Sequence, residues 1–248
     1  MLPDKSMDCV AIIMAGGKSS RMRAGGCSTH KALRTVNGTT LLDHNIVRIC
    51  ECGIKDIWLA ISDSELELRV WTESRASSPA AAFGSTVRII RERDPLGTIG
   101  AARHIPGKYR NVLVVNVDNL CDIDLSALVQ YHLRTRAALT IATHNASFRI
   151  PFGRIETQGG RVLGYSEKPH IAVTISSGFY VLTRKAIEHI PTNCRTDVPE
   201  LVNRLVDGGE LVASFQHAAT WIDVNDEAAL AQAELFFGHQ LRSRAAGD

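Results

Sequence analysis

Two long apolar runs constrain the fold of this chain more than any other feature of its sequence. One is VAIIMAG at residues 10–16, and the other is NVLVVNV at residues 111–117. Neither run alternates between apolar and polar residues, so each predicts a strand that is covered on both faces, as in a parallel sheet flanked by helices. Helical and strand-like patterns alternate between the two runs, at residues 40–51, 54–61, 64–75, 86–91 and 97–104. The N-terminal half is therefore predicted to be βαβαβαβ.

The pattern changes after a predicted helix at residues 125–134. Two short strands flank the turn Gln158-Gly159-Gly160, which indicates an antiparallel hairpin. Further strands are predicted at residues 138–144, 175–182, 211–215 and 220–224, with helices at 198–207 and 227–242. The fold class is α/β: a single domain, residues 1–248, with a mixed, mainly parallel sheet flanked by helices and a C-terminal antiparallel part.

Composition narrows the classes of partner and compartment. The 248 residues are 45% hydrophobic, and 28 Lys plus Arg against 26 Asp plus Glu give a net charge of +2. This balance argues against a nucleic-acid partner. The N-terminal apolar run, residues 9–17, is too short for a membrane span and shows no signal cleavage pattern, so a cytoplasmic protein without a membrane partner is expected. Six scattered cysteines form no CxxC pair and are expected to be structural thiols.

The segment AGGKSSRM follows the first predicted strand directly. A glycine pair in this place lets backbone N–H groups approach a phosphate, and Lys18 and Arg21 add positive charge. The segment lacks the glycine spacing of a Walker A loop and of a dinucleotide fingerprint. By itself the loop is equally consistent with a phosphate site and with an ordinary turn that carries solvated cations.

Six further segments follow the loop in a fixed order. They are a Lys ten residues after Arg21 in His-Lys-Ala, then DPLGTIGAA, VVNVDNLCDID, FGRI with GYSEKP, SSGFYVL and TWIDVNDEAAL. Together the seven segments resemble the sugar-phosphate nucleotidylyltransferase family, also called NDP-sugar pyrophosphorylases, which includes mannose-1-phosphate guanylyltransferases. The resemblance runs from about Val10 to Ala233. It implies a Rossmann-like, GT-A-like domain, with a nucleotide-binding half at about 8–125 and a sugar-phosphate-binding half at about 126–240.

The resemblance implies transfer of a nucleoside monophosphate from an NTP to a sugar 1-phosphate, or to a similar polyol or cyclitol phosphate, with release of pyrophosphate. The nucleophile of such a reaction is already an anion, so cations and amide groups must stabilise charge rather than remove a proton. The catalytic residues implied are Arg21 at the leaving pyrophosphate, Lys31 at the α-phosphate and Asp118 at a metal ion. Mg²⁺ is the implied cofactor, held by Asp118 and Asp223.

Two binding sets follow from the same resemblance. The nucleotide-binding residues are Ala15, Gly16, Gly17, Ser20, Glu92, Gly97 and Thr98. The sugar-phosphate-binding residues are Gly153, Glu167, Lys168 and Ser177. Glu92 stands where uridylyl and thymidylyl members often have Gln. A carboxylate only accepts hydrogen bonds, and guanine offers N1–H and N2–H₂ side by side, so Glu92 favours GTP; the alternative is a surface ion pair with Arg91 or Arg93.

The chain departs from the family pattern at Ser19, His30, Ala32, Val117 and Asn225-Asp226. None of these changes removes a charged group named above. They leave open a non-catalytic nucleotide-sugar sensor or regulatory subunit. A guanylyltransferase acting on a cofactor precursor would also suit GGKSSRM, but such enzymes lack the EKP and SSGFY segments. A homo-oligomer is the common default for enzymes of this kind.

Overall fold

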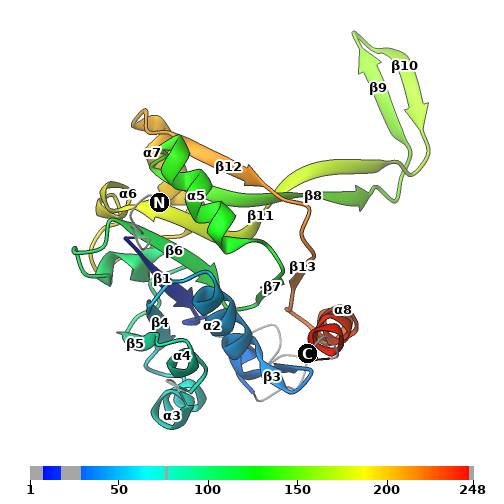
Figure 1. The fold of residues 1–248 in the computed structure, drawn as a ribbon. Coiled ribbons are helices and arrows are strands. Elements are labelled where there is room, and N and C mark those ends of the chain that lie inside the picture. The colour runs from blue at the N-terminus through cyan, green and yellow to red at the C-terminus, as the bar shows by residue number, and fades with distance from the viewer. Residues whose placement is uncertain (1–7, 18–28, 76–77, 246–248) are drawn as a thin grey trace, which may run out of the picture.

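The computed structural model describes residues 8–17, 29–75 and 78–245 (Figure 1). Its centre is a seven-stranded sheet in the order β12-β8-β11-β6-β1-β4-β5. Strands β1, β4, β5 and β6 are mutually parallel, β12 is parallel to β8, and β11 is antiparallel to both β6 and β8. The strands are β1 (Cys9–Met14), β4 (Asp56–Ser62), β5 (Thr86–Glu92), β6 (Asn111–Asn116), β8 (Leu139–Arg149), β11 (His170–Thr183) and β12 (Val212–Gln216). The predicted α/β class is confirmed, including its parallel first half and mixed second half.

Both faces of the sheet are covered. Along β1, Ala11 and Ile13 belong to one core cluster, and Val10 and Ile12 belong to another on the opposite face. The first cluster is covered by α2 (Leu41–Glu51), α3 (Leu66–Arg75), α4 (Ser78–Ala82) and α5 (Leu125–Thr135). The second is covered by η2 (Gly100–His104), α6 (Arg184–Glu188) and α7 (Val198–Asp207). This two-sided burial explains why the central strands are uniformly apolar.

Short elements connect the C-terminal chain to the centre of the sheet. Strand β7 (Asn119–Cys121) pairs antiparallel with β13 (Trp221–Asp223), and β2 (Thr35–Val36) pairs with β3 (Thr39–Thr40). Helix α8 (Glu227–Ala245) packs Ala233 and Phe237 against Leu120 and Ile222. No helix among the described residues is long and apolar enough to cross a bilayer.

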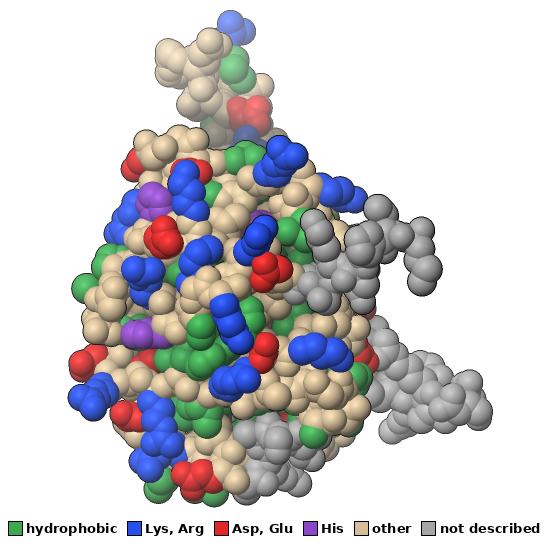
Figure 2. Space-filling model, turned by 60° about the vertical axis from the view of Figure 1, so that its left-hand side comes forward, with side chains coloured by type: hydrophobic (Ala, Val, Ile, Leu, Met, Phe, Trp, Pro, Cys, Tyr) green, Lys and Arg blue, Asp and Glu red, His purple; other side chains and the backbone are tan. Residues whose placement is uncertain are grey.

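Strands β8 and β11 continue past the sheet as a two-stranded ribbon. The pairing extends from the sheet to His170 opposite Arg149, and the Ile150 N–H then donates to the Pro169 carbonyl at 2.9 Å. The expected hairpin, β9 (Arg154–Gln158) with β10 (Arg161–Ser166), projects from the body at the end of this ribbon (Figures 1 and 2). On the face shown in Figure 2, Lys and Arg side chains are interspersed with Asp and Glu and form no continuous basic surface.

The helix predicted at residues 97–104 begins later than expected. Gly97 has a φ of +82°, and the regular segment is the 3₁₀ helix η2, which starts at Gly100. The N–H groups of Thr98 and Ile99 donate to Asp197 and Thr196 instead of starting a helix. Asp124 caps α5, because its carboxylate accepts from the Ala127 N–H at 2.9 Å.

Buried His132 predicts how stability depends on pH. Its side chain is 1% exposed, its Nδ1 lies 2.8 Å from Thr140 Oγ1, and burial lowers its pKa to about 4. In the unfolded chain the His132 imidazole has a pKa of about 6.5, so below this pH it binds a proton in the unfolded state but stays neutral in the folded state. We therefore expect His132 to remove on the order of 3 kcal/mol of unfolding free energy as pH falls from 6.5 to 4.

Urea unfolding at intervals between pH 7 and pH 4 measures this loss. The variant H132Q should show a smaller loss over the same range, whereas H170Q, which changes an exposed histidine, should behave like the parent. Equal pH profiles for the parent and H132Q would contradict the assignment.

Candidate active site

A cavity of about 480 Å³ opens where β1, β5 and β6 end. The carboxyl ends of parallel strands are the usual place for ligands in open α/β sheets. The residues that line the cavity are Met14, Gly16, Gly17, Lys31, Glu92, Pro95, Gly97, Thr98, Asn116, Asp118, Arg195 and Asp197. The cavity thus brings together seven of the residues singled out from the sequence, namely Gly16, Gly17, Lys31, Glu92, Gly97, Thr98 and Asp118.

One end of the cavity carries an ion pair. Lys31 Nζ lies 2.5 Å from Asp118 Oδ2, and both side chains are mostly buried, at 19% and 15% exposure. A Cβ on Gly17 would lie only 3.7 Å from Lys31 Nζ, so the glycine backbone and the ammonium group face the same space. The cation and the approachable backbone are suited to a phosphate group, and the carboxylate is suited to a divalent cation that accompanies it.

His30 holds Lys31 in this position. Its Nε2 lies 3.1 Å from the Gly17 carbonyl, its Nδ1 accepts from the Ala32 N–H, and its backbone N–H donates to Glu67 at 2.7 Å. The imidazole therefore caps the short helix η1 (Lys31–Leu33) and ties it to the glycine turn after β1. His30, one of the departures from the family pattern, thus supplies a specific anchor for the lysine.

Asp118 and Asp223 are brought close by the β7–β13 pair. Asp223 lies opposite Asn119, and the Val224 N–H donates to the Asp118 carbonyl at 2.9 Å. Asp223 Oδ2 accepts from the Asn225 amide, and its side chain is not part of the cavity lining. Both aspartates offer the oxygen ligands that Mg²⁺ prefers. Among the described residues no group of three or more His, Cys, Asp or Glu forms a ready-made metal site, so a bound ion would also need substrate oxygens.

Glu92 lines the same cavity, beside Gly16. The side chain is 3% exposed, and burial raises the pKa of its carboxyl group. Oε2 accepts from the Leu96 N–H at 3.0 Å, but Oε1 is buried without a hydrogen-bond partner among the described atoms. A Cβ on Gly16 would lie 2.8 Å from this carboxylate, so only glycine fits beside it. A buried acceptor left unpaired costs free energy and is best explained by a ligand that donates to it.

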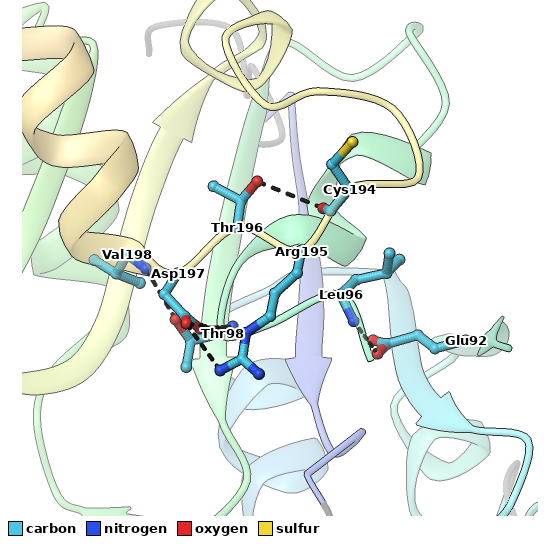
Figure 3. Close-up of polar contacts among 8 residues, drawn as sticks. All are labelled: Glu92, Leu96, Thr98, Cys194, Arg195, Thr196, Asp197 and Val198. Carbon is cyan, nitrogen blue, oxygen red and sulfur yellow. Dashed lines mark hydrogen bonds and ion pairs between the residues drawn. The ribbon is translucent and has the colours of Figure 1, made fainter. Parts of the chain in front are cut away.

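The loop after Glu92 packs on a segment about 100 residues further along the chain (Figure 3). The Thr98 N–H donates to Asp197 Oδ1 at 2.8 Å, and Thr98 Oγ1 accepts from the Val198 N–H at 2.9 Å. Burial opposes ionisation of Asp197, but the hydrogen bonds from Thr98 and Arg195 outweigh it and hold the pKa of Asp197 below its usual value. The two loops therefore form one rigid wall of the cavity.

The variant G97A should break this wall. A Cβ on Gly97 would lie 2.5 Å from the Thr196 carbonyl oxygen, and its φ of +82° adds about 1–2 kcal/mol of strain for any L residue. G84A is the matched control, because Gly84 has a φ of +63° but open space around the added Cβ. We expect calorimetry to show a larger fall in melting temperature for G97A than for G84A. Equal falls would mean that the two loops separate without cost.

The remaining sequence-derived residues lie elsewhere. Ala15 is fully buried next to the cavity, and its N–H donates to Ala60. Arg21 and Ser20 lie outside the described residues. Gly153, Glu167 and Lys168 lie beyond the sheet on the hairpin end of the β8–β11 ribbon and do not line the cavity. Lys168 pairs with Glu167 at 3.9 Å, and both are about half exposed.

Ser177 is fully buried in a hydrogen-bond network. Its Oγ lies 2.9 Å from His144 Nδ1 and 2.7 Å from His217 Nε2, and its carbonyl accepts from Trp221 Nε1 at 2.8 Å. Burial lowers the pKa of both histidines, which favours neutral rings on either side of the hydroxyl. This network fixes the backbone that leads into Gly178, where a Cβ would lie 1.9 Å from the Asn119 amide.

Five cavity residues were not singled out from the sequence, namely Met14, Pro95, Asn116, Arg195 and Asp197, and the last three carry polar side chains. Asn116 could have been found as the last residue of an apolar strand. Arg195 and Asp197 could not, because they precede an ordinary amphipathic helix and nothing local indicates that this segment returns to the loop after β5.

Comparisons with known proteins agree with this geometry. The family described as Nucleotidyl transferase matches residues 10–240. The mannose-1-phosphate guanylyltransferase of Mycobacterium tuberculosis is 29% identical over 221 residues, which is 86% of this chain and 60% of the relative. The mannose-1-phosphate guanyltransferase beta-A of Xenopus laevis is 24% identical over 222 residues, with the same coverage of 86% and 60%. The chain thus spans about three fifths of the length of these relatives.

Solved structures share the fold. A putative glucose-1-phosphate thymidylyltransferase from Bacillus anthracis superposes with a TM-score of 0.70 at 20% identity, covering 92% of this chain and 94% of the other. HddC from Yersinia pseudotuberculosis complexed with GMP-PN superposes with a TM-score of 0.69 at 22% identity, covering 92% of this chain and 99% of the other. At these identities the superpositions show the fold, and the match over residues 10–240 identifies the group: the chain belongs to the nucleotidyl transferase family.

Proposed function

We propose that this protein transfers GMP from GTP to a sugar 1-phosphate, forming a GDP-sugar and pyrophosphate. Membership of the nucleotidyl transferase family and the printed activities of its relatives support the reaction class. One observation supports guanine as the base: Glu92 is buried, and its Oε1 has no partner among the described atoms. Guanine N1–H and N2–H₂ would supply the missing donors, whereas the Watson–Crick edges of uracil, thymine and adenine each carry a single donor position.

The cavity suits the chemistry of nucleotidyl transfer. A phosphate oxygen of the acceptor attacks the α-phosphorus of GTP, and the bond from that phosphorus to the bridging oxygen breaks, so that pyrophosphate leaves. Lys31, Gly16 and Gly17 all line the cavity. Lys31 would offset the charge that develops on the α-phosphate, and the N–H groups of Gly16 and Gly17 would approach the triphosphate. Arg21 remains the proposed ligand of the leaving pyrophosphate.

Mg²⁺ remains the proposed cofactor, held by Asp118 and Asp223 together with phosphate oxygens. When bound, it would supply positive charge to the reacting phosphates and align them. The Lys31–Asp118 pair shows that the Asp118 carboxylate already faces a cationic group in the cavity. Glu167, Lys168, Gly153 and Ser177 remain proposed for the acceptor. For the first three, the β8–β11 ribbon would have to bend toward the cavity, and the fully buried Ser177 would act by holding the backbone that leads into Gly178.

The test is to incubate the purified protein with GTP, Mg²⁺ and a panel of sugar 1-phosphates that begins with mannose 1-phosphate. Pyrophosphate release is followed enzymatically, and the nucleotide-sugar is identified by mass spectrometry. A GDP-sugar whose formation needs both substrates supports the proposal. Calorimetric binding of GTP without turnover on any acceptor would contradict it and favour a sensor.

A further inference from the structure

We infer that Arg195 is a second base-reading residue, whose guanidinium donates to O6 and N7 of guanine while Glu92 accepts from N1 and N2. This inference rests on the proposed use of GTP and extends it to the opposite edge of the same base. Arg195 lines the same cavity as Glu92, and no role for it follows from the sequence.

Arg195 is held in place on one side only. Its Nε and Nη2 donate to Asp197 Oδ2 at 3.3 and 3.0 Å. These two bonds use the Nε side of the planar group and leave the Nη1 and Nη2 hydrogens at its end as a fork with no partner among the described residues. Such a fork fits two acceptors side by side, as in the common pairing of arginine with guanine O6 and N7.

The ion pair with Asp197 links Arg195 to the loop that follows Glu92. Asp197 uses its other oxygen, Oδ1, to accept from the Thr98 N–H, and Thr98 belongs to the turn that follows Glu92 (Figure 3). The chain of contacts therefore runs from Arg195 through Asp197 to the Glu92–Thr98 loop. The other cation named in the cavity lining, Lys31, is bound instead to Asp118.

The surroundings leave Arg195 available for a ligand. Its side chain is 69% exposed, and an exposed ion pair of this kind contributes little to folding stability. The cost of reorienting the guanidinium on ligand binding is correspondingly small. A cavity that donates to one edge of the base and accepts from another would discriminate strongly between guanine and adenine. Adenine presents its N6 amino group where guanine presents O6, so an arginine donor there would meet another donor.

The two edges can be tested separately with GTP analogues. In 7-deaza-GTP a C–H replaces N7, which removes one acceptor for Arg195, and in ITP the N2 amino group is missing, which removes one donor to Glu92. For the parent protein we expect kcat/KM to fall about tenfold with each analogue relative to GTP. R195A should lower kcat/KM for GTP about tenfold and should no longer distinguish GTP from 7-deaza-GTP, while it still discriminates against ITP.

R93A is the matched control, because Arg93 is an exposed arginine near the same loop that does not line the cavity. It should keep the parent preference for GTP over 7-deaza-GTP. R195K keeps the charge without the fork and should behave like R195A toward 7-deaza-GTP. These comparisons separate base reading from a general effect of positive charge.

Three outcomes would overturn the inference. The first is equal kcat/KM for GTP and 7-deaza-GTP in the parent. The second is an R195A defect in kcat/KM that is the same with both nucleotides, as a phosphate contact would give. The third is full recovery of the parent kcat/KM for GTP in R195K. The failure of the proposed function looks different, since the parent would then show no turnover with GTP or would prefer another base.

Discussion

Replacing Asp118 by Asn is expected to lower pyrophosphate release by about 10²- to 10³-fold or more. The substitution keeps the size of the side chain but removes the negative charge that faces Lys31 at 2.5 Å and that would hold a divalent ion. The initial rate of pyrophosphate release at saturating GTP and acceptor measures the loss. Binding of GTP in the absence of metal should persist, because the Gly16–Gly17 backbone and Glu92 are unchanged.

The control for Asp118→Asn is D207N. Asp207 is exposed at the C-terminal end of α7, one helix length after Asp197, and does not line the cavity; its replacement makes the same chemical change. D207N should retain the parent rate and unfolding temperature. D118N breaks a mostly buried ion pair, so its unfolding temperature should fall, and the rates are compared at a temperature at which all three proteins are folded. Substantial activity in D118N would remove Asp118 from the catalytic set.

Replacing Glu92 by Gln is expected to lower kcat/KM for GTP by about 10- to 100-fold and to narrow the preference for GTP over UTP. The glutamine amide oxygen still accepts from Leu96, so the fold of the loop is retained. The amide NH₂ group would now occupy one carboxylate position and oppose a guanine donor. Steady-state kinetics with GTP and UTP measures both effects.

A second variant, E92D, separates an effect on base preference from an effect on folding. E92D preserves the charge but shortens the side chain, so it should lose kcat/KM for GTP while it keeps the ratio of GTP to UTP closer to that of the parent than E92Q does. If E92Q left the ratio unchanged, Glu92 would be a structural partner of Leu96 and the base would be read elsewhere.

Much of the fold could be predicted from the sequence because the strongest signals are local. The uninterrupted apolar runs in β1 and β6 indicate burial on both faces, and the Gln158–Gly160 turn indicates the hairpin. The start of η2 was misplaced because tertiary contacts decide it. Thr98 and Ile99 bind the loop at 194–197, which the local pattern does not reveal.

The candidate site was predictable where its residues follow strands. Gly16, Glu92 and Asp118 lie at or just after the ends of β1, β5 and β6, and strand order alone brings them together. Arg195 was not predictable, because its place in the cavity depends on packing between segments about 100 residues apart. The 14-residue strand β11 likewise extends past the sheet and carries Glu167 and Lys168 away from the cavity, and residue types alone do not fix the direction of such a ribbon.

The most direct test of guanylyl transfer is a competition among five nucleotides. The protein is given equimolar GTP, ATP, UTP, CTP and dTTP with a sugar 1-phosphate and Mg²⁺, and the nucleotide-sugars formed at early times are quantified by mass spectrometry. Their proportions report the ratios of kcat/KM in one reaction. The account predicts that the GDP-sugar dominates, and a UDP- or dTDP-sugar as the main product would contradict it.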